Sequence, residues 1–205
     1  MKLTYNANIY EEKHNNIVKE IAPECTLFLK RNNKDFPLNR DKISEIGLYG
    51  NGVRRTLKGG TGSGNVDIHV FYNIEQVFEN SGLTITSKKW LDAYDEDYAK
   101  RIVNFRSQIK QEAKSLKIDP PAYSVGFVMP EWEHNYDVYL NDDEVAIYVL
   151  SRSSGEGRDR QGGMGKYALT LSEIKNITYL AKHSKKFLLV INAAFPIDIS
   201  SILPA

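Results

Sequence analysis

The feature that most constrains the fold is a set of short runs that are apolar at every position. Residues 145–150 read Val-Ala-Ile-Tyr-Val-Leu, and such a run is typical of a strand with helices on both of its faces. Runs rich in β-branched and aromatic residues also occur at 25–30, 45–50, 83–86 and 187–192. Doubly covered strands occur mainly in parallel sheets. The sequence therefore predicts an α/β fold with a mainly parallel sheet between helices.

Helical patterns separate these runs. The clearest covers 88–117, where apolar residues recur every three or four positions and so share one face of a helix. Its acids come early and its cations late, which we interpret as a structural arrangement that complements the helix dipole. Further helices are predicted at 8–21 and 172–182. A chain of 205 residues is expected to form a single domain over 1–205.

Composition excludes several classes of function. With 27 basic and 26 acidic residues, the chain has no overall field that would attract nucleic acid or an anionic membrane. Cys25 is the only cysteine, and the four histidines lie far apart without the spacing of metal ligands, so no metal site is expected. The N-terminus lacks the apolar core of a signal peptide, which predicts a cytoplasmic protein.

Two long segments exceed the usual length of loops in α/β units. One covers 51–67 after the predicted strand 45–50, and the other covers 151–165 after the strand 145–150. Both leave the carboxyl end of a strand, so in a parallel sheet they emerge at the same edge, where such folds place their sites. We expect function to reside there.

The first loop reads Lys-Gly-Gly-Thr-Gly-Ser-Gly over 58–64. Such glycines let the backbone approach a ligand closely, and Ser63 offers a donor and an acceptor. Phosphate binding is disfavoured because Lys58 precedes the glycines, whereas a P-loop ends in Gly-Lys-Ser/Thr. From these residues alone, a plain surface loop is the simpler interpretation.

The second loop places Glu156 between two glycines directly beyond a buried strand. Flanking glycines would allow a carboxyl to project into a cleft as a general acid, although a lone loop Glu is usually solvated. Nearby Arg158 and Arg160 would favour the ionised form and oppose an acid role. An ion pair of Asp159 or Arg160 that holds the loop is the simpler role for those two residues. The acidic stretch at 131–144 is interpreted as a polar loop in which Trp132 packs, although its ring could also stack on a sugar.

Taken together, the two loops resemble glycoside hydrolase family 3 β-glucosidases. Residues 58–66 are similar to the KGGTGSGDV segment of that family, and 151–160 to its SRxSGEGxDR segment. Residues 25–38 also look like its LLKN…LPL stretch, and the similarity continues in order to 188–198. One departure is Asn65-Val66-Asp67, where the family usually reads Asp-Val-Asn.

The resemblance implies that 1–205 is the three-layer αβα-sandwich domain of a retaining β-glucosidase, from a branch in which the catalytic (α/β)₈ barrel follows. That barrel, which carries the Asp nucleophile, is not present in this chain. Glu156 corresponds to the acid/base, and Thr61, Gly62 and Ser63 to the sugar-binding part of the first loop. Lys58, Asp159 and Arg160 correspond to supporting residues of the loops.

The partners implied are a β-glucoside or oligosaccharide and the barrel domain, with no nucleic acid, membrane or cofactor. The isolated chain is expected to be inactive, because one carboxylate of the required pair is missing. The alternative is a non-catalytic carbohydrate-binding or interaction module with the same fold. A nucleotide-binding module is disfavoured by the incomplete glycine motifs.

Overall fold

The computed structural model describes residues 8–31, 37–59, 71–140, 145–155 and 162–203. These residues belong to two compact units. The smaller contains 1–42 and 67–71, and the larger contains 43–66 and 72–205. The single domain expected over 1–205 stays a prediction, and the units are treated separately below.

A parallel sheet of four strands forms the centre of the larger unit. The strands are β1 (Glu45–Tyr49), β2 (Thr84–Ile85), β3 (Val145–Arg152) and β4 (Lys186–Ala193), and their order across the sheet is β2-β1-β3-β4. Ile46 pairs with Val145 at the start of β1, and β3 pairs with β4 from Val145 opposite Lys186 onward. The prediction of a mainly parallel sheet is confirmed.

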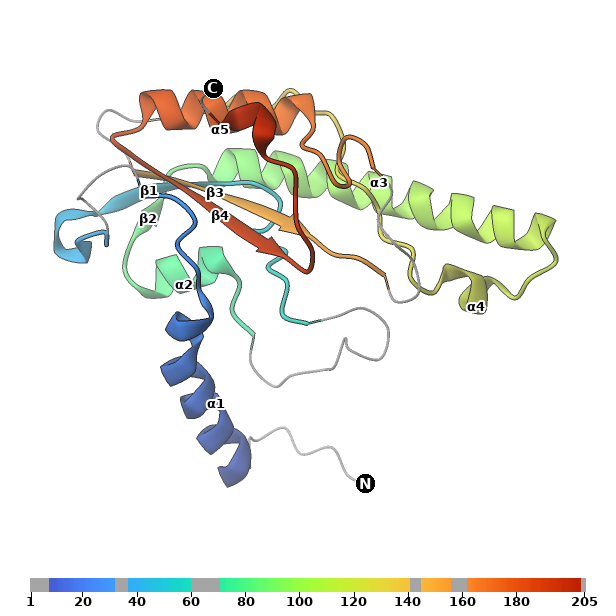
Figure 1. Cartoon of the computed structure of the whole chain (residues 1–205), viewed down its shortest axis with the longest axis horizontal. Helices are drawn as coiled ribbons and strands as arrows, with labels where there is room; N and C mark the ends of the chain where they lie inside the picture. The colour runs from blue at the N-terminus through green and yellow to red at the C-terminus, as the bar shows by residue number, and fades with distance from the viewer. Residues whose placement is uncertain (1–7, 32–36, 60–70, 141–144, 156–161, 204–205) are drawn as a thin grey trace. The chain divides into compact units, whose positions relative to one another are not determined.

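Helices lie on both faces of this sheet. They are α2 (Ile74–Asn80), α3 (Lys88–Ser115) and α5 (Leu171–His183), with a short α4 (Pro120–Ser124) after α3. Figure 1 shows α3 and α5 above the sheet and α2 below it. Right-handed crossovers require this division, because the chain moves from β1 to β2 in one direction and from β2 through β3 to β4 in the other. The three-layer αβα sandwich is thereby confirmed.

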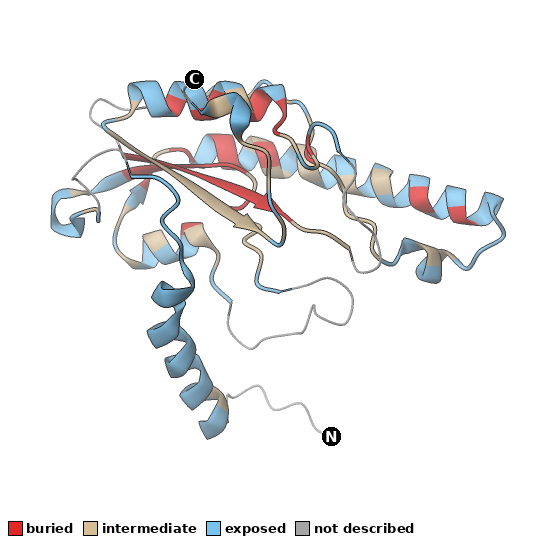
Figure 2. Ribbon diagram, in the orientation of Figure 1, coloured by how far each residue is buried: buried red, intermediate tan, exposed pale blue. Residues whose placement is uncertain are grey.

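The core lies between the sheet and the helices that cover it. Every residue of β3 is buried, and Ile46, Leu48 and Val149 have no exposed surface. Figure 2 shows the buried residues on β1 and β3 and along the sides of α3 and α5. This burial explains why residues 145–150 are apolar throughout, since neither face of the strand meets water.

Local signals define the ends of the helices. Helix α5 begins after Thr170, whose side chain accepts from the backbone N–H of Glu173, and it ends with Lys182 and His183 in its last turn. Helix α2 begins with the same capping box, formed by Asn73 and Gln76. The capping pattern from Asn73 to Gln76 marks the start of α2 in the sequence, although no helix was expected there.

The early acids of α3 have a role other than the one expected from the helix dipole. Arg54, in the loop after β1, donates to Asp92 over 2.7 Å and to Asp95 over 2.8 Å. It also binds both carboxylate oxygens of Glu75 in α2. The first turn of α3 contains no acid. These carboxylates therefore hold the loop after β1 against two helices.

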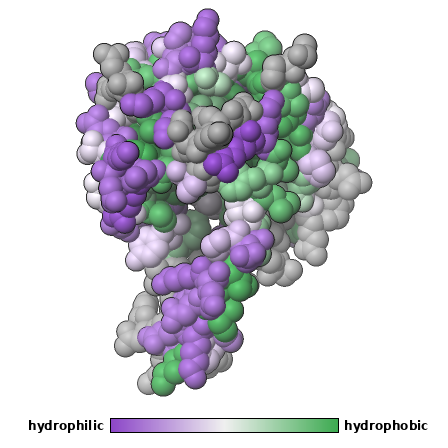
Figure 3. All heavy atoms as spheres, turned by 60° about the vertical axis from the view of Figure 1, so that its left-hand side comes forward, coloured by the Kyte–Doolittle hydropathy of each residue, from purple (hydrophilic) through white to green (hydrophobic). Residues whose placement is uncertain are grey.

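The smaller unit corrects one predicted strand. It contains α1 (Ile9–Ile21) and a 3₁₀ turn η1 (Ala22–Cys25). Residues 26–31 have no regular structure, and Leu27, Phe28 and Leu29 are exposed. The strand expected at 25–30 is wrong because an apolar run becomes a strand only when a neighbouring strand satisfies its backbone hydrogen bonds. Figure 3 shows hydrophobic side chains along one side of α1 and hydrophilic ones along the other.

Gly50 is expected to be essential for the turn after β1. Its φ is +91°, and a Cβ there would contact the carbonyl oxygen of Val149 and lie 2.9 Å from the Tyr148 ring. Gly50→Ala should therefore lower the free energy of unfolding by more than ~1 kcal/mol, measured by urea denaturation. Gly82→Ala is the matched control, because Gly82 has a φ of +81° but no atom within 4 Å of its Cβ position. Equal losses for both variants would show that backbone conformation alone, without the close approach, accounts for the effect.

Candidate functional site

The candidate site lies where the order of the strands reverses. Strand β1 connects to β2 on one side, and the chain then crosses β1 to form β3 on its other side. In open α/β sheets, ligands bind beyond the carboxyl ends of the strands at such a reversal. The two loops predicted to carry function both begin there, at Gly50 and after Arg152. The topology thus confirms that they leave the same edge of the sheet.

Asn51 joins the starts of the two loops. Its Oδ1 accepts from the backbone N–H of Ser151 over 2.7 Å, and its Nδ2 donates to the Ser151 carbonyl over 2.9 Å. The same Nδ2 donates to Glu131 over 2.7 Å. Further along the first loop, the Leu57 N–H donates to Asn192 at the end of β4. Three strand ends are therefore tied together by two Asn side chains.

Arg152 is the buried cation of the site. Its Nη2 lies 2.6 Å from both carboxylate oxygens of Glu173, and its Nη1 lies 3.8 Å from Glu131. The side chain is only 2% exposed. Such a guanidinium persists in the interior only when carboxylates compensate its charge. Arg152 is the last residue of β3, so the network holds the segment that leads to Glu156.

Glu131 is a carboxyl of the site whose pKa lies close to neutral pH. Burial, and next the nearby Glu173 carboxylate, raise the pKa of Glu131 from its usual 4.5 to about 7. Arg152 and the hydrogen bonds from Tyr94 and Asn51 act in the opposite direction. The Tyr94 hydroxyl donates to this carboxyl over 2.9 Å. A carboxyl with this pKa can exchange a proton near neutral pH.

Stability is expected to depend on pH through Glu131. Between pH 4.5 and about 7 the folded chain retains a proton that the unfolded chain has lost, so the free energy of unfolding falls as pH rises through this interval. The contribution is up to roughly 3 kcal/mol. Urea denaturation of Glu131→Gln across this range should give a flatter profile. Glu96→Gln changes an exposed acid of α3 and should keep the original slope; a Glu131→Gln profile identical to it would contradict this prediction.

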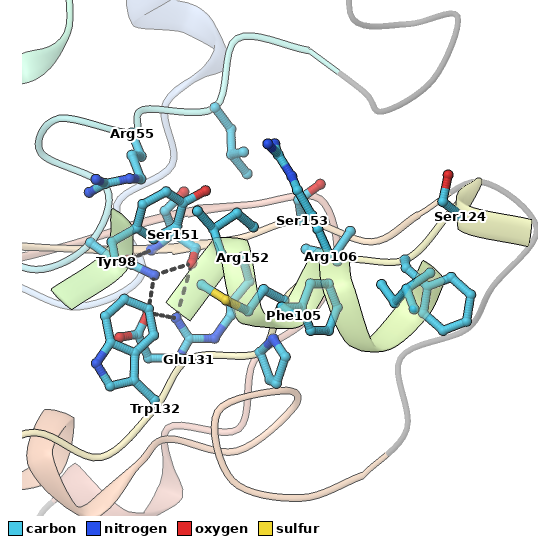
Figure 4. Close-up of a pocket in the computed structure, with 18 of the residues that line it drawn as sticks. Arg55, Tyr98, Phe105, Arg106, Ser124, Glu131, Trp132, Ser151, Arg152 and Ser153 are labelled. Atoms are coloured by element: carbon cyan, nitrogen blue, oxygen red, sulfur yellow. Dashed lines mark hydrogen bonds and ion pairs between the residues drawn. The ribbon is translucent and has the colours of Figure 1, made fainter. Parts of the chain in front are cut away.

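A cleft of about 740 Å³ opens beside this network. Figure 4 shows Glu131, Ser151, Arg152 and Trp132 towards one end of the cleft, Phe105 and Arg106 of α3 further along, and Ser124 of α4 at the other end. The Trp132 ring stacks on Tyr94, and its Nε1 donates to Asp97 over 2.9 Å. The interpretation of Trp132 as a packing residue is thus confirmed. The interpretation of 131–144 as a plain polar loop is wrong for Glu131, which is buried because Asn51, Tyr94 and Arg152 satisfy it.

Most of the predicted site residues lie outside the described residues. This applies to Glu156, Asp159 and Arg160 in the second loop and to Thr61, Gly62 and Ser63 in the first. Lys58 is described and its side chain is exposed. Gly155, the last described residue before Glu156, packs so closely on the Gly126 carbonyl that no Cβ would fit. The flanking glycine is therefore required for contact with the segment after α4.

The described residues contain no group of three or more His, Cys, Asp or Glu side chains that could hold a metal ion. They also contain no helix that is both long and apolar enough to cross a membrane.

Comparison with known proteins identifies the relatives of this fold. The sequence matches the Glycosyl hydrolase family 3 C-terminal domain over residues 26–205. The chain belongs to glycosyl hydrolase family 3. No curated protein matches the sequence.

Solved structures agree with this membership. β-Glucosidase 3B from Thermotoga neapolitana, in complex with glycerol, is 26% identical with a TM-score of 0.63, and the match covers 93% of this chain and 25% of the enzyme. The same enzyme in complex with α-D-glucose is 27% identical with a TM-score of 0.61, over 93% of this chain and 26% of the enzyme.

A β-glucosidase from Paenibacillus barengoltzii has the same fold at 19% identity, with a TM-score of 0.54, over 85% of this chain and 18% of the enzyme. The chain therefore spans about a quarter, or less, of these family 3 enzymes.

Three residues that build this site of the family 3 domain were not anticipated from the sequence. Asn51, Glu131 and Arg152 meet at the carboxyl edge of the sheet. Arg152 had a usable signal, since a cation two positions after an apolar run of six residues is buried only when it is paired. Glu131 had none, because its partners lie 21 to 80 positions away in the chain and only the fold brings them together.

Proposed function

We propose that this chain is the sandwich domain of a retaining β-glucosidase. In this proposal Glu156 is the general acid/base, and Thr61, Gly62 and Ser63 form part of the sugar subsite. A barrel domain of the same enzyme supplies the Asp nucleophile. Lys58, Asp159 and Arg160 support the two loops.

The observation that carries this proposal is the position of the two loops. Both leave neighbouring parallel strands at the reversal of strand order, which is where α/β folds bind ligands. Asn51 bonds them to each other at their bases. Glu156 is the next residue in the sequence after Gly155, the last described residue of the second loop before it. Membership of family 3 and the likeness to a β-glucosidase crystallised with glucose support the same site.

The proposed reaction uses the two carboxyl groups in turn. Glu156 donates its proton to the glycosidic oxygen while the barrel Asp attacks the anomeric carbon, and a glycosyl-enzyme forms as the aglycone leaves. Glu156 then takes a proton from water, which attacks the same carbon and releases the sugar with retained configuration. No metal or organic cofactor enters this scheme.

The test compares this chain with the parent protein that contains the barrel. The parent should hydrolyse an aryl β-glucoside and release β-glucose first, measured by ¹H NMR of the anomeric proton. The 205-residue chain alone should give no turnover, because retaining chemistry needs a second carboxyl about 5–5.5 Å from the first. Binding of a sugar without hydrolysis by the parent would favour the alternative, a non-catalytic carbohydrate-binding module. Turnover by the purified chain that is lost in Glu156→Ala would place a nucleophile in this chain.

A further inference from the structure

The cleft beside the Arg152 network has walls suited to a flat apolar group. Side chains from α3, from the segment after α4 and from residue 132 surround it, among them Tyr98, Phe105, Phe127, Met129 and Trp132. These five side chains are partly exposed, so they are accessible to a ligand, whereas the lining residues Tyr94, Ile109 and Ser151 are buried, as are Glu131 and Arg152. Aromatic and apolar walls with a few polar groups are typical of small-molecule sites, and 740 Å³ lies within their usual range.

The cleft runs alongside the chain that leads to Glu156. Ser151, Arg152 and Ser153 line it, and Gly155 packs against Gly126, which directly precedes the lining residue Phe127. A group bound here would therefore contact the described residues that lead to Glu156, and Asn51, Arg55 and Leu57 at the start of the first loop also line the cleft. In a glycosidase that position suits the leaving group, because the acid must reach the oxygen that joins sugar and aglycone.

Some of the cations that line the cleft are paired with carboxylates, and the others leave an excess of positive charge at its rim. Arg55 is ion-paired with Asp95 over 2.5 Å and lies over the Tyr98 ring, while Arg152 is neutralised by Glu173 and Glu131.

Arg106 and Lys110 are exposed on α3, one helical turn apart. Among the described residues, no carboxylate forms an ion pair with either of them. Figure 4 shows the Arg106 side chain extending from α3 beside Phe105.

We propose that this cleft binds the leaving group of the substrate and selects an aromatic aglycone with an anionic substituent such as a carboxylate. The ring lies among Phe105, Phe127 and Trp132, and the anion faces Arg106 and Lys110. This inference rests on the proposed function for the identity of the ligand as an aglycone. The preference for an anionic aromatic group follows only from the side chains of this chain that form the walls and the rim of the cleft.

The direct test is a titration of the 205-residue chain with 4-hydroxybenzoate, which serves as a free aglycone. The matched neutral probe is 4-hydroxybenzamide, which has the same shape without the charge. NMR signals of the Met129 methyl group and the Trp132 indole N–H report occupation of the cleft. Both probes should shift these signals saturably, and the carboxylate should bind roughly three- to tenfold more tightly because exposed ion pairs contribute little each.

Two variants test whether the cations at the rim cause the preference for the carboxylate. Arg106→Gln should remove most of the preference for 4-hydroxybenzoate while binding of the benzamide stays unchanged. Lys100→Gln is the control, because Lys100 lies on the same helix and is exposed but does not line this cleft. The proposal is overturned if neither probe shifts Met129 and Trp132, if acid and amide bind equally, or if Lys100→Gln has the same effect as Arg106→Gln.

These outcomes are separate from those that test the proposed function. A chain that selects 4-hydroxybenzoate while the parent hydrolyses no glucoside would retain the site and reject the β-glucosidase. A parent that hydrolyses glucosides while the chain binds neither probe would retain the enzyme and reject this cleft as its leaving-group site.

Discussion

In the β-glucosidase proposed above, Glu156→Ala should lower kcat/KM for glucosides with poor leaving groups, such as phenyl or alkyl glucosides, by about 10²- to 10⁴-fold. The same variant should leave kcat/KM for 2,4-dinitrophenyl β-glucoside nearly unchanged, because that aglycone departs without a proton. Turnover of this activated substrate should nevertheless fall, since water then attacks the glycosyl-enzyme without a general base. Steady-state kinetics over a series of leaving groups measures both effects.

Added azide distinguishes an acid/base from a structural carboxylate. Azide needs no general base, so it should restore turnover of the activated substrate in Glu156→Ala and give a β-glucosyl azide. Asp159→Ala in the same loop is the control, and it should slow all substrates alike with no azide product. Equal losses on good and poor leaving groups in Glu156→Ala, without azide product, would assign the acid/base to another residue.

Arg152→Met should lower the free energy of unfolding by about 3–5 kcal/mol at neutral pH. The substitution leaves Glu131 and Glu173 buried without their shared cation, and breaking a buried ion pair from one side has a penalty of this size. The loss should be smaller at pH 5 than at pH 8. Burial already raises the pKa of Glu131, and protonation of this carboxyl at low pH removes its repulsion with Glu173. Urea denaturation at the two pH values measures the difference.

Arg101→Met is the control for this experiment. Arg101 also pairs with a carboxylate, Asp97, but its side chain is 44% exposed, and exposed pairs contribute only about 0–1 kcal/mol. A loss in Arg152→Met as small as that of Arg101→Met, and equal at both pH values, would show that water reaches the two glutamates. The Glu131–Arg152–Glu173 network would then not be the support of the loop that carries Glu156.

The amino-acid sequence determined the architecture of this protein. Residues 145–150 are apolar at every position, and this pattern alone predicts a strand covered on both faces, as found for β3. The long pattern at 88–117 predicts α3 to within two residues of its end. Both succeed because burial of a whole face requires apolar side chains at regular intervals, which a sequence records directly. The family was also recognisable, since the loop motifs are contiguous in the chain.

Local pattern misled at residues 25–30. The run is largely apolar, but residues 26–31 have no regular structure and Leu27 is 81% exposed. A strand depends on hydrogen bonds to a neighbour that the run itself does not contain.

Only the tertiary structure decided how the site is built. Asn51, Glu131, Arg152 and Glu173 come from four separate parts of the chain, and nothing in their immediate neighbours marks them as a group. Glu131 reads as one acid of a polar loop, yet the fold buries it against Arg152 and Tyr94 and moves its pKa close to neutrality. The cleft with Arg106 and Lys110 at its rim likewise forms only when α3 lies beside the segment after α4. Desolvation and charge pairing depend on distances across the fold, and a sequence gives only distances along the chain.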